Sequence, residues 1–183
     1  MTAADILIAT PFAGRTSQVT KVLRHPGADL AVLWVEPAGL SAVRPLAGIA
    51  QNPQYGAEIA AVGFPEDSSA MDNSSPPGRY FRGNIQRFLV HESSHGFKYH
   101  AAELSIGAPA GLSGGPVLLV GQVALLVGVV AENYESSTYL RTLEEFSEPG
   151  KEYREKVHSV INYAMAVCLL PHESWLLREI EGY

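Results

Sequence analysis

The stretch Gly111-Leu112-Ser113-Gly114-Gly115-Pro116, followed by the apolar run Val117–Val120, decides the fold that we expect. Glycines on both sides of the serine let the backbone turn sharply and expose the Ser113 hydroxyl. The N–H groups of Gly111 and Ser113 can then point into one small space. This is the geometry of a serine nucleophile with its own oxyanion hole.

Two other interpretations of this stretch stay open. A glycine-rich turn with a serine can be purely structural. Gly-x-Ser-x-Gly also fits the strand-to-helix elbow of an α/β-hydrolase, an esterase-like hydrolase on another fold. That elbow needs a helix after the serine, and then an acid and a histidine. Here Pro116 and an apolar run follow, and no Asp occurs after Ser113, although glutamates, His158 and His172 do.

Composition narrows the classes of protein. The chain has 183 residues, enough for one domain or two small lobes, and 46% are hydrophobic, so a core can be buried. The net charge of −6 and the lack of a basic cluster argue against nucleic acid as a partner. The single cysteine, Cys168, excludes an internal disulfide, and no Cys/His spacing suggests zinc. We expect neither a metal nor a cofactor.

The chain shows no sign of a membrane segment. Its first basic residue is Arg15, which does not fit the charged-then-apolar pattern of a signal peptide. The most apolar stretch, Pro116–Ala131, spans 16 positions (131 − 116 + 1) and is broken at Gly121-Gln122. A bilayer span needs about 20 residues. We expect a cytoplasmic protein without a membrane partner.

Short extended runs at intervals typical of a barrel or sandwich dominate the first two thirds of the chain. They are Ile6–Thr10, Gln18–Leu23, Leu30–Val35, Glu58–Val62, Tyr80–Arg82, Ile85–Val90, Phe97–Ala102, Val117–Val120 and Val123–Ala131. In the tail, Tyr139, Leu143 and Phe146 have helical spacing, and Pro149-Gly150 would end that helix. Ile161–Val167 predicts a last strand and Trp175–Ile180 a closing helix.

The nucleophile loop resembles that of trypsin/chymotrypsin-like serine peptidases. Asp29-Leu30-Ala31 is similar to the motif that carries the catalytic aspartate in this family, although Asp29 can also be a turn cap. Gly56–Pro65 and Tyr163–Val167 resemble further strands of bacterial members. The resemblance implies a mainly β fold, a chymotrypsin-like double β-barrel with C-terminal helices. Residues 1–64 would form a truncated first lobe and residues 65–183 the second, with the nucleophile loop.

The family histidine is missing from its expected position. Thr2-Ala3-Ala4 resembles the stretch before that histidine, but the next residue is Asp5, 24 positions before Asp29 (29 − 5). A carboxylate is a poor base at pH 7. The other histidines are candidate bases, and His91 and His95 flank a loop that can reach an active cleft. The expected catalytic set is therefore Ser113 and Asp29, with Asp5 in place of the base.

The resemblance also suggests substrate contacts and two functions. Gly107 stands where specificity for Lys or Arg needs a carboxylate, so small or apolar side chains are favoured. Val130 lies on the strand that pairs with substrate, and Glu132 can add charge. The chain is either a serine endopeptidase or a catalytically dead pseudo-peptidase that binds peptides or regulates. We expect a polypeptide substrate or ligand, and a partner segment or chain can complete the first barrel.

Overall fold

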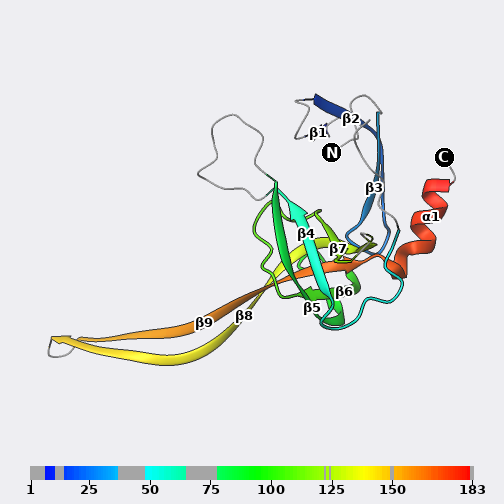
Figure 1. The fold of residues 1–183 in the computed structure, drawn as a ribbon. Helices are drawn as coiled ribbons and strands as arrows, with labels where there is room; N and C mark the ends of the chain where they lie inside the picture. The colour runs from blue at the N-terminus through cyan, green and yellow to red at the C-terminus, as the bar shows by residue number, and fades with distance from the viewer. Residues whose placement is uncertain are drawn as a thin grey trace.

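The computed structural model describes residues 7–10, 15–36, 48–64, 78–121, 123, 125–148 and 151–181, and it is mainly β (Figure 1). The expected mainly β class is confirmed. Three parts that the sequence analysis discussed lie outside the described residues. They are Asp5, the rest of the segment before Leu7, and the polar loop between Pro65 and Pro77.

The N-terminal part is a three-stranded antiparallel sheet in the order β1-β2-β3. Its strands are β1 (Leu7–Thr10), β2 (Arg15–Arg24) and β3 (Ala31–Val35). The turn between β2 and β3 contains Pro26, Gly27 and Asp29, residue types that favour turns because of their backbone preferences. This turn carries the expected catalytic aspartate.

The other strands close into a six-stranded barrel in the order β4-β5-β6-β9-β8-β7, and all its strand pairs are antiparallel. They are β4 (Glu58–Gly63), β5 (Arg79–Glu92), β6 (Lys98–Leu104), β7 (Pro116–Leu119), β8 (Leu125–Glu148) and β9 (Lys151–Cys168). The barrel therefore starts at Glu58. The lobe boundary that the sequence predicts at residue 64 would separate β4 from its partners β5 and β7, so the barrel begins earlier than expected.

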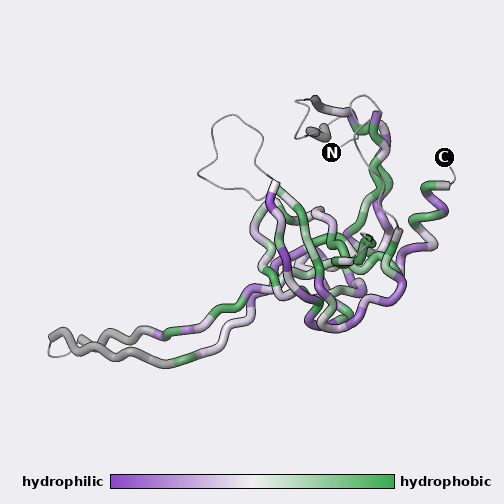
Figure 2. Tube along the Cα trace, in the orientation of Figure 1, coloured by the Kyte–Doolittle hydropathy of each residue, from purple (hydrophilic) through white to green (hydrophobic). Residues whose placement is uncertain are grey.

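The helix expected around Tyr139–Phe146 is wrong, because this segment belongs to β8. The helical spacing reflects only local periodicity, whereas β8 pairs with β9 along a continuous antiparallel ribbon up to Glu148 and Lys151. Pro149-Gly150, which was expected to end the helix, lies outside the described residues. Outside the barrel, this ribbon forms a long arm (Figure 1). Figure 2 shows polar and apolar residues interspersed along the part of the arm nearer the barrel.

The chain closes with η2 (Leu170–His172), a short 3₁₀ turn, and α1 (Glu173–Glu181). The expected closing helix is thus confirmed, and α1 is the one α-helix among the described residues. None of the helices in the described ranges combines the length and apolar character that a membrane crossing demands.

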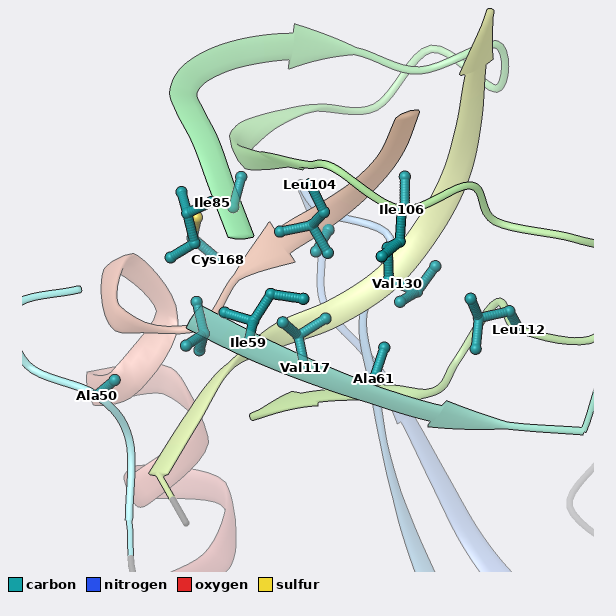
Figure 3. Packing of buried hydrophobic residues seen from close by; sticks show 14 residues of the cluster. Ala50, Ile59, Ala61, Ile85, Leu104, Ile106, Leu112, Val117, Val130 and Cys168 are labelled. Atoms are coloured by element: carbon teal, nitrogen blue, oxygen red, sulfur yellow. The ribbon is translucent and has the colours of Figure 1, made fainter. Parts of the chain in front are cut away.

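The main core fills the barrel. Side chains of β4, β6, β7 and β8 meet there, and Figure 3 shows Leu112 reaching the same core from the serine loop. Leu112, Ile59 and Leu104 are fully buried. The residues after Ser113 form β7, not a helix, in an antiparallel barrel. The strand-to-helix elbow of an α/β-hydrolase therefore does not occur here.

Candidate active site

Ser113 lies in a tight loop between β6 and β7. The N–H of Leu112 donates to the Pro109 carbonyl at 3.0 Å, and the N–H of Gly115 donates to the Leu112 carbonyl at 2.9 Å. Gly111 and Gly114 have φ angles of +86° and +84°. A side chain there would add about 1–2 kcal/mol of backbone strain, so glycine on each side of Leu112-Ser113 suits this loop.

The loop is anchored on both sides. Inward, the Leu112 side chain is 0% exposed in the barrel core. Along the backbone, the N–H of Gly114 donates to the Val130 carbonyl at 2.8 Å, and the N–H of Val130 donates to the Gly115 carbonyl at 2.9 Å. Both backbone groups of Val130 are thus engaged and its side chain is 1% exposed. Val130 therefore supports the loop, and its expected contact with substrate stays a prediction.

The Ser113 side chain is exposed, as expected, and its hydroxyl donates to the Ala131 carbonyl at 3.1 Å. Ala131 lies at a bulge in β8, where the pairing with β9 shifts between Val130 and Glu132. A bulged residue is left out of the ladder, so its carbonyl can turn toward another group. Among the described residues, no histidine forms a hydrogen bond with Ser113.

The N–H groups of Gly111 and Ser113 are the expected oxyanion donors. Within the described part of the chain, neither donates to a protein acceptor. An oxyanion hole needs donors left open in this way. Their convergence on one point stays a prediction.

Asp29 lies in the β2–β3 turn with an exposed side chain. It lines a pocket of about 450 Å³ with Arg24, His25 and Phe97. Its neighbour Ala28 is buried with Tyr99, and Ala131 packs against the same cluster. This cluster brings the Asp29 turn to the strand that holds the Ser113 hydroxyl. No described group donates a hydrogen bond to the Asp29 carboxylate.

An imidazole–carboxylate pair lies beside this arrangement. His91 Nε2 is 3.0 Å from Glu132 Oε2, and the Ser94 N–H donates to Glu132 Oε1 at 3.1 Å. Glu132 directly follows Ala131, so the pair stands one residue along β8 from the acceptor of Ser113. His91 was already a candidate base from the sequence. Its pairing with Glu132 was not predictable, because it depends on how the strands fold together.

Tyr99 lies under this group. Its ring meets the His91 ring edge to face, with the ring centroids 5.6 Å apart. Its hydroxyl is buried without a partner among the described residues. Burial, together with the charges of Glu132 and Asp29, raises the pKa of Tyr99. The phenol therefore stays protonated and cannot act as a base near neutral pH.

Gly107 faces two amides that the sequence analysis missed. A Cβ at Gly107 would lie 3.5 Å from Asn162 Cβ and 4.0 Å from Asn133 Oδ1. Asn133 Oδ1 accepts the Ala108 N–H at 3.0 Å, and Asn133 Nδ2 donates to Asn162 Oδ1 at 3.2 Å. A side chain reaching Gly107 would meet polar amides. A preference for small or apolar side chains was expected from Gly107 alone. A prediction of specificity at this position must also take Asn133 and Asn162 into account.

Cys168 is not a second nucleophile. Burial raises the pKa of its thiol to about 11, which keeps it protonated at neutral pH. The described residues contain no group of three His, Cys, Asp or Glu side chains that could hold a metal ion. Neither family models nor curated proteins yield a match to this chain.

Proposed function

We propose that this chain is a trypsin-like serine peptidase homologue that binds polypeptide at the Ser113 loop and hydrolyses it slowly or not at all. The loop supports this proposal through its exposed hydroxyl and the open N–H groups of Gly111 and Ser113. A binding module of this kind needs no cofactor.

The observation that carries the proposal is the hydrogen bond from the Ser113 hydroxyl to the Ala131 carbonyl. A carbonyl can accept a hydrogen bond but cannot remove the proton, so Ser113 is not activated there. Loss of the base costs a Ser-His-Asp enzyme roughly 10⁶ in turnover. The same carbonyl can accept an N–H from a polypeptide, so ligand binding and the Ser113 bond would compete for it.

The proposed architecture is a chymotrypsin-like double barrel. The closed barrel β4–β9 corresponds to the second lobe, and the β1–β3 sheet to part of the first. A sheet of three strands in the described residues leaves two outer edges, and open edges favour pairing with another segment. A partner segment or chain that completes the first lobe belongs to this proposal.

One observation favours a second candidate, an active serine endopeptidase. His91 and Glu132 form a ready imidazole–carboxylate pair one residue from Ala131. A shift of this imidazole to Ser113 would supply a base, with Glu132 orienting it in the role expected for Asp29.

Labelling with a serine-directed fluorophosphonate separates the two candidates. The unmodified chain should label at most slowly, close to the background level of Ser113→Ala. Asp5→His should label faster, because it restores an imidazole at the expected position. Fast labelling that both Ser113→Ala and His91→Ala abolish would establish the second candidate. Exposed His158 provides the matched control, His158→Ala, which should label like the unmodified chain. Absence of labelling in every variant, together with no binding of a random peptide library, would refute both candidates.

A further inference from the structure

A pair of histidines joins two distant parts of the chain. His25 follows β2 in the turn that carries Asp29, and His172 ends η2 directly before α1. His25 Nε2 and His172 Nδ1 are 3.1 Å apart, and the two rings meet edge to face at 4.4 Å. The ring centroids of Trp175, in α1, and His25 are 4.7 Å apart. The β2–β3 turn is thereby held against the C-terminal segment.

The hydrogen bonds fix where the protons are. The Gly27 N–H donates to His25 Nδ1 at 3.0 Å, so that nitrogen carries no proton. Neutral His25 must then carry its proton on Nε2 and donate it to His172 Nδ1. His172 in turn carries its proton on Nε2, which is buried without a partner among the described residues. The arrangement requires both rings to be neutral.

Protonation of either ring breaks this set of bonds. A proton on His25 Nδ1 would face the Gly27 N–H, and a proton on His172 Nδ1 would face the His25 Nε2–H. Two donors then point at each other. In agreement, burial lowers the pKa of His25, and burial with the neighbouring His25 and His100 lowers the pKa of His172.

The surroundings give a protonated ring little compensation. The titratable or charged groups near the pair come from β2, the turn, β6 and α1: Arg24, Asp29, His100 and Glu173. Arg24 and His100 oppose a further positive charge. Glu173 accepts a hydrogen bond from Gln51 at 2.9 Å. Among the described residues, no carboxylate forms a hydrogen bond with either imidazole.

We propose that His25 and His172 form a pH-released clasp that holds the β2–β3 turn on the C-terminal helix while both imidazoles are neutral. The clasp does not depend on what Ser113 does. It controls the turn that carries Asp29, and acid releases that turn from α1.

The direction of the pH effect follows from linkage. The open state titrates near the ordinary histidine value of about 6.5, whereas the closed state binds protons only at lower pH. The clasp is therefore at full strength above about pH 6.5 and weakens as the pH falls. Each pH unit in that window multiplies the open-to-closed ratio up to about tenfold for one proton taken up, and up to about a hundredfold for two.

The first test uses the unmodified protein. Imidazole ¹⁵N NMR at pH 8 should show His25 and His172 both protonated on Nε2 and neutral. Titration toward pH 5 should show both rings taking up protons below the ordinary histidine value of about 6.5. Rings that titrate at or above that value, or a proton on His25 Nδ1 at pH 8, would overturn the clasp.

The second test follows the release through Trp175 fluorescence in a Trp34→Phe background. We expect an emission change between pH 7 and pH 5 as Trp175 leaves His25. His172→Asn is the decisive variant, because its amide oxygen can accept the His25 proton but does not titrate; it should move the change to lower pH. His158→Ala, on the distant arm, should leave it in place. An unmoved transition in His172→Asn would overturn the proposal.

Discussion

Leu112 and Ser113 are adjacent in sequence and have opposite environments. The Leu112 side chain is enclosed by the barrel core, whereas Ser113 is exposed and makes one side-chain hydrogen bond, to Ala131. A buried leucine contributes to stability through packing and removal of apolar surface from water. An exposed hydroxyl contributes little, so Leu112 rather than Ser113 holds the loop in place.

Substitution of these neighbours should separate the two roles. We expect Leu112→Ala to lower the free energy of unfolding by about 2–5 kcal/mol, because it leaves a cavity in the core. Ser113→Ala should cost no more than about 1 kcal/mol, the contribution of one ordinary hydrogen bond. Urea denaturation of both variants measures the difference. Equal losses would show that Ser113 is a structural residue.

At the residue scale, part of the site is predictable from sequence. Gly111, Ser113 and Gly114 can be recognised from the sequence, because the loop they form is a local turn that depends only on their spacing. The contacts of Ala131, Asn133 and Asn162 depend on a bulge and on the register between β8 and β9. Register is set by pairing across the barrel, so no short stretch of sequence contains it.

At the element scale, β5 and β6 are joined by a partly buried ion pair. Arg87 and Glu103 are register partners, and both Arg87 Nε and Nη2 donate to Glu103 Oε2, at 3.0 and 2.7 Å. Glu103 is 7% exposed, so its charge depends on this partner. The contact also raises the pKa of Arg87, mainly through the hydrogen bond to Glu103.

Removal of one partner should cost more than removal of both. Arg87→Ala leaves a buried carboxylate unpaired, and we expect a loss of about 1–3 kcal/mol in the free energy of unfolding. Arg87→Met with Glu103→Leu should recover most of that loss, because no buried charge remains. Thermal unfolding of the single and double variants decides. A double variant less stable than Arg87→Ala would contradict this explanation.

The strands of the barrel follow from sequence better than the arm does. β4, β6 and β7 coincide with expected runs to within two residues. β5 is one strand where two were expected on either side of Gly83-Asn84. Gly83 suits its position because a Cβ there would lie 2.7 Å from Ile106 Cγ2. This glycine therefore allows a close approach between two segments and does not mark a turn. The first part of β8 agrees with the expected run Val123–Ala131, whereas a helix was expected over its later part, around Tyr139–Phe146. Local spacing predicts that helix because the pairing with β9, which follows in the chain, is not visible in a short stretch of sequence.

The arm should be separable from the barrel. Among the side chains that the structure describes, neither core cluster contains an arm residue between Asn133 and Asn162. Replacement of residues 137–160 by Asn-Gly would connect the register partners Ser136 and Ile161 through a favoured hairpin turn. We expect the shortened chain to keep the near-ultraviolet circular dichroism and thermal midpoint of the full chain. Loss of a cooperative transition would show that the arm stabilises the barrel.

At the scale of the whole molecule, a small interface holds the β1–β3 sheet to the barrel. Ala28 of the β2–β3 turn packs with Tyr99, Ala101 and Val167, and the His25–His172 contact lies beside it. The barrel has its own larger core, built around residues such as Ile59 and Leu104. The two parts therefore differ in how much buried apolar surface stabilises them.

Amide hydrogen exchange should reveal this difference. We expect amides of β4 and β6 to exchange only through global unfolding, and those of β2 and β3 to exchange through a smaller opening. Mass spectrometry of peptides from each part measures the two free energies. Equal protection throughout would show that the sheet and the barrel unfold as one unit.

The arm also governs how the molecule moves through solution. The 16 residues from Asn133 to Glu148 (148 − 133 + 1) extend, at about 3.3 Å each, to roughly 50 Å. A compact chain of 183 residues would have a radius of gyration of only about 16 Å. Small-angle scattering should therefore give a larger radius and a long tail in the distance distribution. Such a particle tumbles slowly and anisotropically for its mass, because the two strands of the arm extend well beyond the barrel (Figure 1).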